Sequence, residues 1–268
     1  MQTHGLASLG VIVLLAGLMQ AAAGVAKVGT WFRAVSPAVI HGMLAGIGAL
    51  ILTGQFHVMI DDEPHGSGLS NLMSIPDAII KGLTPLDNSP HHLAAWVGIA
   101  TITIMVLWDK FAPKRLHVLP GPLVGVTAAT LAAGMLDLPI AYVSVPTDLT
   151  AAFNAPTASA WAGLASPTIW LSAVAVAIIA SAETLLCASA VDRMHDGPRT
   201  AFNKELFAQG VGNALCGLLG ALPMTGVIVR SSANVEAGGK TRRSAILHGA
   251  WLLLLVVTAP QVLALIPV

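Results

Sequence analysis

The chain has 268 residues, with thirteen basic and thirteen acidic side chains and therefore no net charge. Hydrophobic residues make up 55% of it and charged residues only 10%, and the mean hydropathy is +0.79. Ordinary soluble domains carry about 25% charged residues, so this composition excludes a soluble globule. It also argues against a nucleic-acid partner, and indicates a multi-span membrane protein with no soluble domain.

Seven stretches are apolar and long enough to cross a bilayer, which takes roughly 17–25 residues. In chain order they are 6–26, 37–58, 93–108, 118–136, 167–191, 202–222 and 244–266. Long hydrophilic loops are expected at 59–91 and 137–165. An eighth apolar segment, 226–237, is only about half a span long. The predicted fold is therefore all-α, a transmembrane bundle of about eight segments.

The basic residues predict an orientation, because cytoplasmic loops are rich in Lys and Arg. If each full stretch crosses and the short one completes a crossing, eleven cations fall on one side: Lys27, Arg33, Lys110, Lys114, Arg115, Arg193, Arg199, Lys204, Lys240, Arg242 and Arg243. The opposite loops contain only Lys81. The remaining cation, Arg230, lies inside the short apolar segment.

The same topology requires residues 221–226 to descend as extended backbone, with a helix beginning near the middle of the membrane. Such backbone is tolerated only inside protein or beside a wet cavity. Half-helices that begin there bind anions in secondary transporters, through their free N–H groups and positive dipole end. Gly226 would let a ligand approach the backbone closely. The alternative is a kinked helix, broken at Pro223 and Gly226, whose Arg230 reaches the interface.

Glu183 is a second ionisable group within an apolar stretch. Acidic side chains in spans are rare and usually face a cavity or a partner. A carboxylate there can take up a proton or coordinate sodium, and Cys187 follows one helical turn later on the same face. The alternative is a static ion pair between Glu183 and Arg230.

Other motifs carry less chemistry. The sequence Gly239-Lys240-Thr241 ends like a phosphate-binding loop, but Asn234 stands where that loop requires glycine. Asn203 is expected to cap the sixth segment, and the glycines at 42, 46 and 48 suit close helix packing. No Ser-His-Asp set, metal cluster or H-E-x-x-H motif appears, so we expect no enzyme, no metal and no cofactor.

The most specific signal is a resemblance to a known family. The stretches SAETLLCASAVDRM and FNKELFAQGVGNALCGLLGALPMTGVIVRSSANVEAGGKTRRSAILHG resemble the core of the SulP family of inorganic anion transporters. SPAVIHGMLAGIGALILTGQ and LPGPLVGV resemble its earlier spans. The resemblance implies an inverted-repeat (7+7) fold, in which the anion lies between two facing half-helices. Residues 1–268 would then be a partial transport domain, with 226–237 as the second half-helix. The first half-helix, the last three segments and the usual cytoplasmic domain are expected outside this chain.

The resemblance also implies site residues. Gly226, Val227 and Ile228 would offer backbone groups to the anion or the coupling ion, and Arg230 would add positive potential. Glu183 and Cys187 match positions that hold the cation in sodium-coupled bicarbonate members, which use aspartate and threonine. Because cysteine is a poor sodium ligand, proton and sodium coupling both stay open.

The implied function is secondary active transport of a small inorganic anion, sulfate or bicarbonate, in a bacterial inner (plasma) membrane. The expected partners are that anion, a coupling cation, the lipid bilayer and a second copy in a homodimer. One alternative is a uracil- or purine-type permease of the same architecture. The other is a truncated membrane fragment that does not transport.

Overall fold

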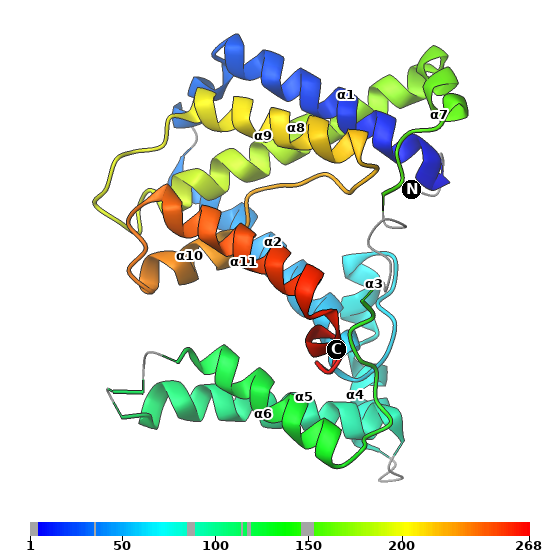
Figure 1. Cartoon of the computed structure of the whole chain (residues 1–268), viewed down its shortest axis with the longest axis vertical. Coiled ribbons are helices and arrows are strands. Elements are labelled where there is room, and N and C mark those ends of the chain that lie inside the picture. Colours follow the sequence, from blue (N-terminus) through cyan, green and yellow to red (C-terminus); the bar gives the residue numbers. More distant parts are fainter. Residues whose placement is uncertain (1–4, 35, 85–88, 114, 117–118, 146–152) are drawn as a thin grey trace. The chain divides into compact units, whose positions relative to one another are not determined.

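A computed structural model describes residues 5–268 except 35, 85–88, 114, 117–118 and 146–152 (Figure 1). In this described part the regular elements are helices, apart from one isolated antiparallel bridge between Tyr142 and Pro267. The elements are α1 (Gly5–Val25), η1 (Val28–Ala34), α2 (Pro37–Met59), α3 (Gly68–Met73), α4 (Ile75–Leu83), α5 (Pro90–Phe111), α6 (Gly121–Met135), α7 (Ala158–Ala162), η3 (Gly163–Ala165), α8 (Pro167–Val191), α9 (Phe202–Leu218), α10 (Ile228–Glu236), α11 (Arg242–Thr258) and α12 (Pro260–Leu263).

Each predicted span contains a helix, namely α1, α2, α5, α6, α8, α9 and α11. Four described helices are long and apolar enough to cross a membrane: Ser8–Val25, His41–Met59, Pro90–Phe111 and Pro167–Val191. The helix α6 is shorter than predicted because Pro120 and Pro122 set its beginning at Gly121.

The chain divides into two compact units, each built from two separate stretches. The first comprises Met1–Gly42 and Asp148–Trp251, and the second comprises Met43–Thr147 and Leu252–Val268. Two of the three boundaries therefore fall within α2 and α11.

In the first unit, α1 and α9 lie with their backbones in direct contact. A Cβ placed on Gly17 would lie 2.6 Å from the Gly210 carbonyl oxygen, and a Cβ on Gly210 equally close to that of Gly17. Gly10 and Gly217 approach each other in the same reciprocal way, at 2.8 and 2.6 Å. Small residues permit this separation, since any larger side chain would push the helices apart. The predicted close-packing glycines in α2 behave differently: a Cβ at position 42, 46 or 48 meets nothing within 4 Å in the described structure.

The helix α8 packs against this pair within the same unit. Toward one end Val11 of α1 packs with Ile169 and Ala173 of α8. Toward the other end Leu185 of α8 packs with Leu206 of α9. These three helices form the support on which the candidate site is built.

The predicted cap of the sixth segment is wrong. The N-cap residue of α9 is Ala201, which makes no side-chain cap. The Asn203 side chain instead accepts a hydrogen bond from the Thr30 N–H at 3.0 Å. Because Thr30 lies in η1, directly after α1, Asn203 links the end of α1 to the beginning of α9.

Both loops predicted to be hydrophilic contain short helices. The first holds α3 and α4, and the second holds α7 and η3. In α4, Pro76 lies in the first turn with Asp77, and Lys81 lies in the last turn. These are favourable positions for a helix, but the segment is too short to register as a span.

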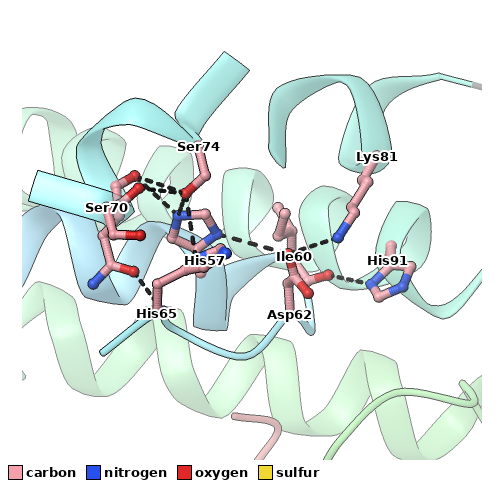
Figure 2. Close-up of polar contacts among 9 residues, drawn as sticks. His57, Ile60, Asp62, His65, Ser70, Ser74, Lys81 and His91 are labelled. Carbon is pink, nitrogen blue, oxygen red and sulfur yellow. Dashed lines mark hydrogen bonds and ion pairs between the residues drawn. The ribbon is translucent and has the colours of Figure 1, made fainter. Parts of the chain in front are cut away.

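In the second unit, a group of polar side chains joins the end of α2 to the loop that follows it (Figure 2). We call this group the clasp; it consists of His57, Asp62, Asn71, Ser74 and Lys81. His57 is 1% exposed, and its Nε2 lies 3.1 Å from both the Asn71 carbonyl oxygen and Ser74 Oγ. Its other nitrogen, Nδ1, lies 3.7 Å from the Asp62 carboxylate. Lys81 donates to the same carboxylate at 3.0 Å, so the clasp reaches from α2 to α4.

The Asp62 carboxyl titrates below its ordinary range. Its partial burial would raise the pKa, but the hydrogen bond and the charge of Lys81 outweigh this effect and leave the pKa lowered.

A further contact joins the end of α2 to α5. His91 lies at the beginning of α5, and its Nδ1 is 2.8 Å from the Ile60 carbonyl oxygen (Figure 2).

Candidate functional site

The chain between α9 and α10 is not helical. Gly220 has a φ of +69°, and a Cβ there would overlap the Asn154 carbonyl, so glycine is required. Residues 221–227 then run without regular structure, because Pro223 offers no N–H for a helix and restricts the residue before it. Val227, at φ −112° and ψ 111°, precedes the first turn of α10. The predicted interruption of the helix, followed by a short helix, is confirmed.

The beginning of α10 presents backbone N–H groups that have no partner within the helix. The first N–H groups of any helix lack a partner inside the helix, and that end carries partial positive charge. In the described structure no side chain caps α10, and its first turn contains no acidic residue. Such a helix end is suited to binding an anion.

The side chains next to this helix end come from α8. The Gly226 N–H donates to Thr184 Oγ1 at 2.8 Å. A Cβ placed on Gly226 would lie 3.5 Å from the Cys187 Cβ, and the backbone amide of Ile228 faces the Cys187 sulfur. Glu183 is only partly buried and directly precedes Thr184 in α8. The structure therefore brings Gly226, Ile228 and Cys187 together.

Two other predicted residues lie further out. Val227 is 37% exposed, and Arg230, in the first turn of α10, is exposed. Among the salt bridges of the described residues, none joins Arg230 to Glu183, so the static ion pair considered from the sequence does not form. The guanidinium charge of Arg230 instead adds to the positive end of the helix dipole.

Three buried amides near the break were missed from the sequence. Gln20 of α1, with Gln209 and Asn213 of α9, are each at most 5% exposed. Asn213 binds the main chain of Met224, and Gln209 Nε2 donates to the Ala180 carbonyl of α8 at 2.9 Å. Their occurrence within apolar helices was the available signal, because polar side chains in spans usually have a partner.

Metal binding has no candidate centre in the part of the chain that the structure describes, since no three His, Cys, Asp or Glu side chains gather there. The histidines at the end of α2 lie against serine and main-chain oxygens and, for His57, the single carboxylate of Asp62. His65 Nδ1, for example, is 3.3 Å from Ser74 Oγ.

Comparison with known proteins identifies the family of the chain. A profile described as the sulfate permease family matches residues 2–268. The chain belongs to the sulfate permease family. The resemblance noted from the stretches around Glu183 and Arg230 is thereby confirmed.

The chain also resembles a solved structure, the transmembrane domain of a cyanobacterium bicarbonate transporter, BicA. The TM-score is 0.71 at 23% identity, over 99% of this chain and 65% of that one. This likeness confirms the predicted inverted-repeat, all-α transporter fold.

The relatives of this chain are named as transporters. The bicarbonate transporter BicA of Synechocystis sp. is 26% identical, over 98% of this chain and 45% of its own length. The putative sulfate transporter YvdB of Bacillus subtilis is 28% identical, over 96% of this chain and 47% of its own length. The chain thus spans about half the length of these relatives, and their names agree with the prediction that it is not an enzyme.

Proposed function

We propose that the protein containing this chain carries a small inorganic anion, sulfate or bicarbonate, across the membrane by secondary active transport. The observation that carries the proposal is the uncapped beginning of α10, held against α8 after the non-helical segment 221–227. A half-helix of this kind offers donors and positive potential without a bulky side chain. The transporter names of the relatives support the same conclusion.

In this proposal each site residue has a distinct role. The backbone N–H groups of Val227 and Ile228 hold the anion, and Arg230 strengthens the positive field. Gly226, whose own N–H is bonded to Thr184 Oγ1, lets the anion approach because it has no side chain. Glu183 carries the coupling charge, because anion uptake against a negative membrane potential requires a co-transported cation.

The coupling cation is a proton or sodium. Cys187 lies beside the helix end, where its sulfur is a poor ligand for sodium, while the Glu183 carboxylate can serve either cation. Residues 1–268 form part of the transport domain, in a bacterial inner membrane and in a homodimer.

The proposal is tested by uptake of labelled sulfate and bicarbonate into proteoliposomes containing the full-length protein. Uracil serves as a third substrate, and protein-free liposomes are the control. We expect saturable uptake of an inorganic anion and no uptake of uracil. Uptake of uracil alone would contradict the proposal in favour of a nucleobase permease, and uptake of none would contradict transport.

A further inference from the structure

The non-helical segment 221–227 is held by a buried amide. Asn213 of α9 is fully buried. Its Oδ1 accepts a hydrogen bond from the Met224 N–H at 2.7 Å, and its Nδ2 donates to the Met224 carbonyl oxygen at 3.2 Å. One side chain therefore satisfies both main-chain groups of a residue that has no helix or sheet partner.

A chain of hydrogen bonds from α8 determines how this amide is oriented. Gln20 of α1 donates through Nε2 to Ser181 Oγ at 3.1 Å and to the Ala177 carbonyl oxygen at 3.4 Å. Its Oε1 then faces Asn213, whose Nδ2 donates to it at 2.8 Å. Because a carbonyl oxygen can only accept, rotating either amide by half a turn would set like groups against each other.

A second side chain holds the segment two residues further on. Thr184 of α8 is 5% exposed, and its Oγ1 accepts from the Gly226 N–H at 2.8 Å. Other hydroxyls of the same helix behave differently: Ser181 and Ser189 donate to the carbonyls four residues before them. That is the common arrangement for hydroxyl side chains within apolar helices. The Thr184 hydroxyl instead connects α8 to the segment that leads into α10.

We infer that Asn213 and Thr184 are positioning residues for the anion site. They hold Met224 and Gly226, and thereby set the direction in which the first N–H groups of α10 point. The inference rests on the proposed function, because it concerns the same helix end. It means that anion affinity depends on two side chains that do not touch the anion, and on Gln20 behind one of them.

If Asn213 and Thr184 served only to pack the helices together, a different set of contacts would be expected. To join α1 and α9, the bond between Gln20 and Asn213 would be enough. The bonds to Met224 and Gly226 add nothing to that helix pair, since both residues lie in the segment beyond α9. The two roles also differ in what they change: a positioning residue alters the KM for the anion, whereas a packing residue alters yield and melting temperature.

Thr184 offers the cleanest test, in the full-length protein reconstituted into proteoliposomes. Thr184→Val keeps the shape of the side chain and removes the acceptor, whereas Thr184→Ser keeps the hydroxyl. Ser189→Ala is the matched control, because it removes a hydroxyl of α8 that bonds to its own helix. We expect Thr184→Val to raise the KM for the transported anion about tenfold with little change in kcat, as loss of one buried hydrogen bond would. Thr184→Ser and Ser189→Ala should keep the wild-type KM.

Hydrogen–deuterium exchange provides a second measurement that needs no transport. Thr184→Val, and Asn213→Ala where it folds, should accelerate exchange over residues 221–230 and leave α1 unchanged. Faster exchange across α1 and α9 as well would assign a general packing role and overturn the inference. An unchanged KM in Thr184→Val would also overturn it. If the wild-type protein takes up neither anion, the proposed function fails, and the exchange result still decides whether Thr184 positions the segment.

Discussion

At the scale of single residues, the candidate site has one acidic and one basic side chain, Glu183 in α8 and Arg230 in α10. They do not neutralise each other, as no salt bridge joins them among the described residues. Glu183 is partly buried in α8, and Arg230 is exposed in α10. Under the proposed function, Glu183 attracts the coupling cation and Arg230 attracts the anion.

We predict that Glu183→Gln abolishes concentrative anion uptake and leaves expression and membrane insertion intact. Neutralising a partly buried acid removes its desolvation cost, so the variant should fold. The measurement is uptake into proteoliposomes with an imposed proton or sodium gradient, with Ser189→Ala as the control on the same helix. Gradient-driven uptake equal to wild type would remove the coupling role of Glu183.

The clasp around Asp62 predicts a dependence of stability on pH. The pKa of Asp62 is lowered in the folded protein, so its pairing with Lys81 stabilises the fold above the ordinary value of 3.8, and this contribution is lost as the pH falls through the lowered value. The Lys81 side chain is 52% exposed, so the pair contributes only about 0.2–1 kcal/mol.

Lys81→Met should accordingly lower the melting temperature slightly at neutral pH, and the difference from wild type should shrink below pH 3.8. Thermal unfolding in detergent between pH 3 and pH 7 measures this. A difference that stays constant over the whole range would show that the ion pair is not its cause.

Whether a site residue could be found from the sequence depended on how rarely its side chain occurs in an apolar span. Glu183 was identified because a carboxylate in an apolar span is rare. Thr184, its neighbour, was missed because hydroxyl residues are common in membrane helices and usually bond to their own helix. Asn213 and Gln20 were visible as amides in apolar segments, but their pairing joins residues 193 positions apart, and local patterns contain no information about it.

At the scale of the elements, hydropathy predicted the helices in the long apolar stretches, and Pro223 with Gly226 predicted the break before α10. Hydropathy did not identify which helices pack against each other. The close pair is α1 with α9, because their glycines at 10, 17, 210 and 217 face one another. In α2 the glycines at 42, 46 and 48 are spaced as if for close packing, but a Cβ at these positions meets nothing within 4 Å in the described structure.

Gly17→Leu should separate α1 from α9 and destabilise the protein, since a Cβ there already lies 2.6 Å from the Gly210 carbonyl oxygen. Overpacking of this kind typically costs about 1–3 kcal/mol. Gly134→Leu in α6 is the matched control, because a Cβ at that position meets nothing within 4 Å. The comparison is made by melting temperature and by recovery of monodisperse protein in detergent. Equal behaviour of the two variants would contradict the close helix pair.

At the scale of the whole molecule, the chain alternates between two compact units, and two of its three passages between them lie within α2 and α11. The position of a helix could be predicted at each apolar stretch of sufficient length. The grouping of helices into units could not, because each unit combines stretches that are far apart in the sequence. The charge asymmetry still makes a global prediction, that Lys81 and Lys110 lie on opposite sides of the membrane.

Single cysteines test this topology. Lys81→Cys and Lys110→Cys, each in a background with Cys187 and Cys216 replaced, should react with an impermeant thiol reagent from opposite sides. We expect Lys81→Cys to react in intact cells and Lys110→Cys only after the membrane is opened. Labelling of both from the same side would contradict the arrangement of spans between them.

The most direct test of the central claim is to locate the anion itself. Selenate is a sulfate analogue whose selenium gives an anomalous diffraction signal, so crystals of the full-length protein grown with selenate reveal its position. We predict an anomalous peak at the beginning of α10, placed so that the selenate oxygens lie within hydrogen-bonding distance of the backbone amides of Val227 and Ile228. Sulfate and bicarbonate should each displace it. A displaceable peak elsewhere in the protein, with none at this helix end, would contradict the account.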